Sequence, residues 1–338
     1  MPSQVVYNKD LGYLIPEEEI DKTINAIGIK ERRVADESTC ASDLCFKAAQ
    51  KLMEDNNIDV NTIDMLLFLS QTPDYKIPAT APILQHRLGL STTTACFDLN
   101  LACSGFVYGL STAFSYASQQ GINRVLLLVG ETFSKIVSSC DKVNLPLYGD
   151  AGTATLIEKG DYSDSFFELM SDGSGAKTIM IPAGECRNPA TAENLQITEK
   201  EEGNKRSDNQ IYMDGMDVFN FTLRIVPKAI KDMLAKISLQ SECDGADPVV
   251  DYFSFHQANK FMIDFIVKKL KIDPAKVPFS IDRFGNTSSA SIPLTMVCEL
   301  AKMREKKKVI LCGFGAGLSW ATAYMELSNC AISSLAEV

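Results

Sequence analysis

One cysteine stands in a segment that favours nucleophilic chemistry. Cys103 lies in LNLACSGFVYGLSTAFSYA, where small residues flank the thiol and a long apolar helical pattern follows. A thiol at the start of a helix has free N–H groups and partial positive charge beside it, and both lower its pKa. The segment therefore predicts a nucleophile that a carbonyl carbon can approach. A buried core thiol is the alternative interpretation.

Two further segments carry polar groups of the type that assist such a nucleophile. His256, in FSFHQAN, directly follows a buried strand pattern, and the carboxyl ends of parallel strands are where α/β folds bind ligands. A satisfied structural histidine is the alternative. Asn286, in DRFGNTSSASIPL, opens a helical pattern. Its side-chain N–H groups could donate to a developing oxyanion, or the residue could cap the helix.

Other chemistries fit these residues less well. His86, in ILQHRLGL, is expected at the surface and not in catalysis. A Cys, His and Asn set in this order also occurs in papain-like proteases, but the residues around Cys103 do not match that signature. The GFGAG segment (313–317) has its glycines spaced G-x-G-x-G and precedes an alternating strand pattern. It predicts a tight turn that brings backbone N–H groups to a site, not a nucleotide loop.

The elements that must position these residues alternate between strands and helices. Apolar runs predict strands buried on both faces at 64–69, 124–130, 249–255 and 308–314. Helical patterns cover 38–56, 216–237 and 259–272, and the polar stretch 183–209 predicts a surface loop. This alternation predicts an α/β protein with mostly parallel sheets.

The chain also shows signs of an internal duplication. Similar segments recur at offsets of about 183 to 187 residues, as for the strands at 64–69 and 249–255 and for the segments around Cys103 and Asn286. We expect two related halves, 1–172 and 173–338. Chance similarity among strands is the alternative.

Composition limits the classes of function. The chain has 338 residues, 46% hydrophobic and 22% charged, which is typical of globular proteins. A net charge of −10 argues against a nucleic-acid or anionic-membrane surface, and we expect no membrane-spanning or signal segment. Ten cysteines without a CxxC pair and only two histidines predict buried reduced thiols, a cytoplasmic location and no metal site.

Six segments in order carry a family resemblance. GIKERR (28–33), LACSGF, YGDAGTA, FHQAN, FGNTSSAS and GFGAGLSWA together resemble the β-ketoacyl-acyl-carrier-protein synthase III family of thiolase-fold condensing enzymes. The resemblance implies a thiolase-like five-layer α-β-α-β-α fold with two duplicated halves, and a homodimer.

The resemblance also implies a role for individual residues. Cys103 would accept the acyl group, while His256 and Asn286 would handle decarboxylation of the second substrate. The oxyanion hole would consist of the backbone N–H groups of Cys103 and Ala316. The substrate pocket would be lined by Ile77, Phe314, Gly315 and Gly317, with Ile77 reaching across the dimer to limit starter length. Because Ile77 is β-branched where an aromatic residue is common, we expect room for starters longer than acetyl.

The implied reaction joins two acyl groups. Acyl transfer from acyl-CoA to Cys103 would precede a decarboxylating Claisen condensation with malonyl-acyl carrier protein, giving a β-ketoacyl product that initiates fatty-acid synthesis. No metal or redox cofactor is expected. The implied partners are acyl-CoA, acyl carrier protein and a second copy of the chain.

The sequence departs from the family pattern at two places. Lys22 and Ala26 align where a Trp and an Arg of the CoA clamp are common, and Lys260-Phe261 replaces an Arg associated with carrier-protein docking. Lysines that could supply a docking patch instead are Lys260, Lys268, Lys269 and Lys271, with a solvated helix face as the alternative. A specialised homologue with another acyl donor or acceptor, in a lipid or secondary-metabolite pathway, and a non-catalytic acyl-binding scaffold both stay open.

Overall fold

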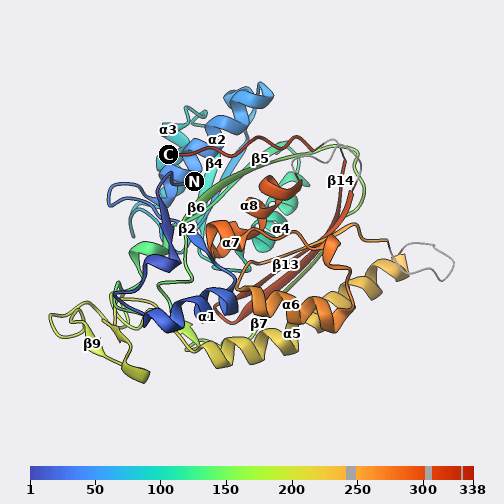
Figure 1. Ribbon diagram of the computed structural model, residues 1–338. Helices are drawn as coiled ribbons and strands as arrows, with labels where there is room; N and C mark the ends of the chain where they lie inside the picture. Colours follow the sequence, from blue (N-terminus) through green and yellow to red (C-terminus); the bar gives the residue numbers. More distant parts are fainter. Residues whose placement is uncertain (241–248, 301–306, 329) are drawn as a thin grey trace.

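Two four-stranded sheets form the centre of the molecule (Figure 1). The computed structural model describes residues 1–240, 249–300, 307–328 and 330–338. The first sheet has the order β4 (Ala95–Leu99), β3 (Met65–Leu69), β5 (Arg124–Glu131) and β6 (Ala151–Glu158). The second has the order β12 (Tyr252–Phe255), β13 (Lys307–Gly315), β14 (Ser319–Leu327) and β7 (Phe166–Ser171).

The central strands are buried on both faces, as their continuous apolar runs predict. Alternate side chains point to opposite faces of a sheet. Leu67 of β3 and Leu311 of β13 therefore join one core between the two sheets. Phe68 and Cys312, one residue further along each strand, join separate cores on the outer faces.

Helices fill the space between the sheets and cover both outer faces (Figure 1). The inner layer contains α4 (Gly105–Ala117) and α8 (Ser291–Leu300). Covering the first sheet are α2 (Ala41–Asn56) and α3 (Thr80–Arg87), and covering the second are α5 (Gly215–Gln240) and α6 (Lys260–Leu270). This arrangement confirms the predicted five-layer α-β-α-β-α fold.

Strand pairing repeats in the two sheets. In each, a parallel pair is followed by an antiparallel partner: β3, β5 and β6 in the first, and β12, β13 and β14 in the second. The division at residue 172 stays a prediction, and β7, which ends at Ser171, already pairs with β14 of the second sheet.

Shorter elements complete the fold. They are α1 (Glu17–Ile27), α7 (Ile281–Phe284), the 3-10 turn η7 (Ser288–Ala290), and the strand pairs β1 (Val5–Tyr7) with β2 (Glu31–Arg33), β8 (Ile179–Met180) with β11 (Tyr212–Met213), and β9 (Thr198–Glu199) with β10 (Lys205–Arg206). The predicted loop at 183–209 thus contains the small β9–β10 pair.

The cysteines are less uniformly buried than the sequence predicted. Nine fall in the described residues and all are free thiols, but Cys140, Cys186 and Cys330 are exposed. Burial was expected because most cysteines stand in apolar runs, yet these three lie in connecting segments and not in sheets or helices. Cys243 lies outside the described residues. Within those residues, no helix is long and apolar enough to cross a membrane.

Candidate active site

Cys103 lies where the sequence placed it, in the short connection between β4 and the first turn of α4. The residue is 8% exposed. Strand β13 of the other half passes directly behind it, because a Cβ atom on Gly315 would lie 2.7 Å from Cys103 Cβ and 2.8 Å from its Sγ. Only glycine permits this approach, so the nucleophile candidate is held at the contact between the two halves.

Hydrogen-bond donors surround the Cys103 sulfur. Burial is the largest effect on the thiol and raises its pKa to about 11. The Ser288 hydroxyl and the backbone N–H groups of Ala316 and Cys103 act in the opposite direction and lower it. The two backbone donors predicted for an oxyanion hole therefore face the Cys103 sulfur.

His256 follows β12 directly, and its ring is enclosed in the protein. The residue is 1% exposed, and its backbone N–H donates to Cys312 O at 2.8 Å. Burial lowers the pKa of the imidazole to about 3, so the ring is neutral at ordinary pH. Phe314, predicted to line the substrate pocket, packs edge-to-face on this ring at 5.4 Å between centroids.

The hydrogen bonds around His256 indicate which ring nitrogen carries the proton. Its Nδ1 lies 2.7 Å from Ser291 Oγ. The same oxygen accepts the Gln257 backbone N–H at 3.4 Å, and its own proton can be donated to Nδ1. With Nδ1 accepting, the proton of a neutral imidazole resides on Nε2.

Asn286 connects α7 to η7 and is buried. Its backbone is fixed on both sides, because its N–H donates to Leu147 O at 2.8 Å and its carbonyl accepts the Gly149 N–H at 3.1 Å. The side-chain Oδ1 accepts the Ser288 backbone N–H at 2.9 Å. This bond assigns the oxygen of the amide, so the Nδ2 end is the one turned toward other partners.

The three predicted residues meet around Ser288. Its Oγ lies 3.7 Å from Cys103 Sγ, its N–H binds Asn286, and its backbone interacts with the His256 ring. Sequence reasoning missed both Ser288 and Ser291. The signal was the polar run GNTSSAS, in which several hydroxyls sit where an apolar helix start would be expected.

Other predicted site residues lie farther out. Gly317, with a φ of 136°, stands in the tight turn between β13 and β14, which confirms the turn predicted for GFGAG. Ile77 is 89% exposed on the surface of the single chain and does not enter its interior.

The lysines predicted for carrier-protein docking lie on and beside α6. Lys260 is paired with Asp264, and Lys269 Nζ donates to Leu223 O at 3.0 Å. The Asp264 carboxylate therefore offsets the charge of Lys260 in the predicted docking patch, while Lys269 keeps its charge.

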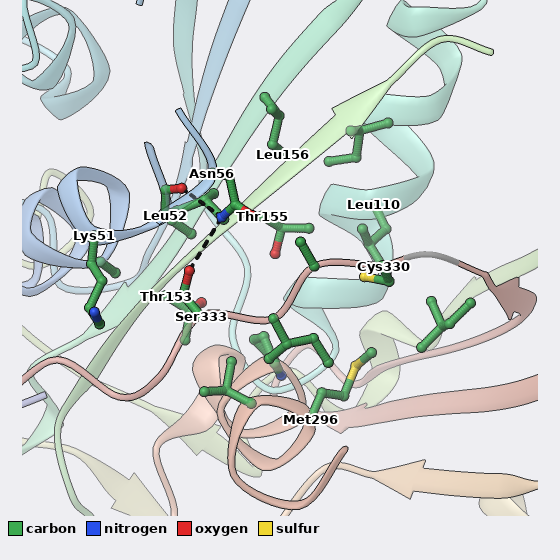
Figure 2. Close-up of a pocket in the computed structure, with 18 of the residues that line it drawn as sticks. Lys51, Leu52, Asn56, Leu110, Thr153, Thr155, Leu156, Met296, Cys330 and Ser333 are labelled. Atoms are coloured by element: carbon green, nitrogen blue, oxygen red, sulfur yellow. Dashed lines mark hydrogen bonds between the residues drawn. The ribbon is translucent and has the colours of Figure 1, made fainter. Parts of the chain in front are cut away.

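A cavity of about 520 Å³ lies away from these residues (Figure 2). Side chains of α2, α4, β6 and α8 and the C-terminal segment line it, among them Leu110, Thr155 and Met296. Asn56 Nδ2 donates to Leu52 O at 2.8 Å and to Ser333 Oγ at 3.4 Å, which attaches the C-terminal segment to α2. Cys103, His256 and Asn286 are not part of its wall, so it is a feature separate from the candidate active site.

Comparisons with known proteins agree with this geometry. Residues 97–173 match the family model of 3-oxoacyl-[acyl-carrier-protein (ACP)] synthase III, and residues 246–327 match its C-terminal counterpart. A β-ketoacyl-[acyl-carrier-protein] synthase III from Rhodopirellula baltica is 34% identical over 96% of this chain and 94% of its own.

Solved structures show the same relationship. A 3-oxoacyl-(acyl-carrier protein) synthase from Burkholderia xenovorans LB400 superposes with a TM-score of 0.90 at 37% identity, covering 100% of this chain and 94% of its own. A crystal structure of a 3-oxoacyl-(acyl-carrier-protein) synthase III gives the same TM-score of 0.90 at 36% identity over 97% of both chains. The chain belongs to the 3-oxoacyl-[acyl-carrier-protein] synthase III family of acyl-transferring condensing enzymes.

Proposed function

We propose that this protein transfers an acyl group from acyl-CoA to Cys103 and condenses it with a malonyl group on acyl carrier protein, as in the first step of fatty-acid synthesis. The observation that carries the proposal is the gathering of Cys103, His256 and Asn286 around Ser288, with two backbone N–H donors at the sulfur. These are the groups that the two half-reactions require.

In the first half-reaction, Cys103 Sγ attacks the thioester carbonyl of acyl-CoA. The N–H groups of Cys103 and Ala316 stabilise the oxyanion. A new C–S bond forms as the bond to CoA breaks, and the proton of the Cys103 thiol ends on the CoA thiol. Because the resting pKa of Cys103 is about 11, the proton leaves as the attack proceeds and not before it.

In the second half-reaction, malonyl carrier protein loses carbon dioxide, and an enolate remains on its thioester. His256 Nε2–H and Asn286 Nδ2–H donate to the enolate oxygen. The enolate carbon attacks the acyl carbonyl, so that a C–C bond forms and the Cys103 C–S bond breaks. The released Cys103 thiolate takes up a proton from solvent and returns to the thiol. Every group in this scheme belongs to the chain or its two substrates, and we propose no metal or redox cofactor.

We further propose a homodimer in the cytoplasm. Strand β4 is the outer strand of the first sheet, and its residues are not fully covered, so it is open to pairing with a second copy. The highly exposed Ile77 would then reach a partner's pocket. The free thiols of the described cysteines fit a reducing compartment.

One observation favours a specialised acyl donor over acetyl-CoA. Lys22 and Ala26 lie on α1, where the clamp residues of the CoA adenine were expected. On α6, Phe261 is 58% exposed and stacks on Phe219 with 5.5 Å between ring centroids. The exposed Phe261 ring beside Lys260, stacked on the half-buried Phe219, presents an apolar surface where an arginine associated with carrier-protein docking was expected.

Intact-mass spectrometry tests the proposal directly. The protein is incubated with acyl-CoAs and acyl carrier proteins of two to twelve carbons, beside Cys103→Ala and the exposed-thiol control Cys186→Ala. We expect an acyl adduct in the wild type and in Cys186→Ala but not in Cys103→Ala. An adduct that survives in Cys103→Ala would refute the assigned nucleophile, and the donor that labels fastest identifies the starter class.

Asn286→Ala separates condensation from simple acyl transfer. Transfer to an oxygen or nitrogen acceptor needs no enolate, so it would survive this change. We expect Cys103 acylation to persist in the variant while formation of the β-ketoacyl product falls at least about a hundredfold, the usual effect of losing an oxyanion donor.

A further inference from the structure

A buried carboxyl group lies close behind the active site. Glu131 is the last residue of β5 and is 0% exposed. Glu131 takes no part in the reaction proposed above. A buried carboxylate is stable only when hydrogen-bond donors surround it, so its partners show which parts of the fold it holds.

One carboxylate oxygen holds the loop that follows β3. Glu131 Oε2 accepts from Ser70 Oγ at 3.2 Å, from the Gln71 backbone N–H at 3.0 Å and from Thr72 Oγ1 at 3.1 Å. Thr72 in turn accepts the backbone N–H of Thr132, the residue after Glu131, at 2.9 Å. These bonds fix the carboxylate firmly in the first half of the molecule.

The other oxygen reaches the catalytic loop of the second half. Glu131 Oε1 accepts from Ser289 Oγ at 2.8 Å. Ser289 is the middle residue of η7. It directly follows Ser288, on which Cys103, His256 and Asn286 converge, and it lies two residues before Ser291, the partner of His256 Nδ1. The Glu131–Ser289 bond thus joins the two halves at the candidate active site.

We propose that Glu131 is a positioning residue that, through Ser289, holds the loop 286–291 in the arrangement that places Ser288 and Asn286 beside Cys103. The proposal rests on the function proposed above, because the loop matters for the condensation step. A shift of about 1 Å in a catalytic group can lower a rate about a hundredfold, and the Ser289 bond is the contact through which Glu131 reaches this loop.

The charge of Glu131 also acts on the nucleophile. Burial raises the pKa of its carboxyl to about 7, while the hydrogen bonds from Ser289 and the loop after β3 lower it. The titratable groups on which it acts are two thiols, Cys103 and Cys45, and its negative charge raises the pKa of both. Cys45 stays a thiol because burial raises its pKa to about 12.

Two substitutions test the link and the charge separately. Ser289→Ala removes the bond to the loop but leaves the three donors on Oε2 in place. Glu131→Gln removes the charge but keeps the link, because the Ser289 hydroxyl can turn to accept from the amide. Ser134→Ala is the matched control, since Ser134 Oγ likewise donates to a buried carboxylate, Asp150 Oδ2, at 2.5 Å.

In Ser289→Ala we expect the rate of Cys103 acylation and kcat for condensation both to fall about tenfold to a hundredfold, because displaced Ser288 and Asn286 act on both steps. KM for acyl-CoA and Tm should stay close to those of Ser134→Ala. In Glu131→Gln we expect condensation within about threefold of the wild type. Its pH profile of Cys103 alkylation by iodoacetamide should move to lower pH, because a negative charge near the thiol has gone.

Equal condensation rates in Ser289→Ala and Ser134→Ala would overturn the positioning role. An unchanged alkylation profile in Glu131→Gln would overturn the effect of the charge. The alkylation measurement needs none of the proposed substrates. If the wild type accepts no acyl donor, the proposed function fails, yet Ser289→Ala must still alkylate more slowly than Ser134→Ala, because a displaced Ser288 no longer donates to the sulfur.

Discussion

Ser288 Oγ lies 3.7 Å from Cys103 Sγ, and Ser288 holds this position from a left-handed backbone with a φ of 50°. A non-glycine residue in that region costs about 1 to 2 kcal/mol. The Asn286 side chain compensates by accepting the Ser288 backbone N–H. Asn286 therefore shapes the loop that carries the hydroxyl, in addition to presenting its own Nδ2 group.

Removing the Ser288 hydroxyl should make Cys103 less reactive. The hydroxyl lowers the pKa of the thiol, so Ser288→Ala raises that pKa, and alkylation by iodoacetamide at pH 8 slows by about tenfold, the effect of losing a hydrogen bond to a charged group. Ser288→Gly removes the same hydroxyl while relieving the backbone strain. Both variants must slow the reaction, and unchanged rates in the pair would show that the hydroxyl does not act on the sulfur.

Gly315→Ala should block acylation of Cys103. The added methyl group would lie 2.7 Å from Cys103 Cβ and 2.8 Å from its Sγ, so either the cysteine or β13 must move, and misplacement of this size costs about a hundredfold in rate. Gly215→Ala is the control, because a Cβ there meets nothing within 4 Å. The initial rate of adduct formation by intact mass measures the effect, and equal rates in the two variants would contradict the close contact.

The sequence located Cys103, His256 and Asn286 because each follows or opens a strongly patterned element. Apolar runs predicted strands buried on both faces, and the structure confirms them with small shifts in their ends, as for β12, which begins at Tyr252. The residue types at the ends of these elements then indicated chemistry. Local pattern was sufficient here because the apolar runs of the strands are continuous and their ends are marked by polar residues.

The site features that could not be predicted from the sequence depend on contacts between segments that are far apart along the chain. Ser288 and Glu131 make the contacts described above only because η7 of one half packs against the β4–α4 connection and β5 of the other. No local period distinguishes a buried Glu at the end of an apolar strand from an exposed one. Phe314 is similar, since its contact with the His256 ring joins two segments that are far apart in the sequence.

His256 and Glu131 should affect stability with opposite dependence on pH. The folded-state pKa of His256 is about 3, below its ordinary 6.5, so the unfolded chain takes up the proton and stability is lost as pH falls below 6.5. The folded-state pKa of Glu131 is about 7, above its ordinary 4.5, so the folded chain takes up the proton and stability is gained as pH falls from 7 to 4.5. Between pH 7 and pH 5, each group changes the free energy of unfolding by about 2 kcal/mol, and the two changes have opposite signs.

Urea unfolding at pH 7 and pH 5 separates these two effects. Relative to the wild type, His256→Gln should lose less stability on acidification, and Glu131→Gln should lose more. The quantity compared is the difference in unfolding free energy between pH 7 and pH 5 within each variant. A destabilisation that is the same at both pH values therefore cancels. Identical pH dependence in all three proteins would show that neither group has the environment described here.

Ile77 should limit the length of the acyl starter, and we expect this effect only in the dimer. It is 89% exposed in the single chain, so its effect on the pocket requires a second copy to receive it. We expect the wild type to acylate faster with four- to eight-carbon donors than with acetyl-CoA. Ile77→Phe should shift this preference toward acetyl by about tenfold or more, since each methylene in a filled pocket is worth about 1 to 3 kcal/mol.

Val143→Phe is the matched control for this change, because Val143 is 43% exposed and lies outside the proposed pocket. Light scattering with size-exclusion chromatography gives the oligomeric state of each variant beside the acylation rates. A preference that moves in Ile77→Phe while the protein is monomeric would contradict the route through a partner. A dimeric Ile77→Phe with the wild-type preference would show that the starter is limited elsewhere, because the bulkier ring would then fill no space that the acyl chain uses.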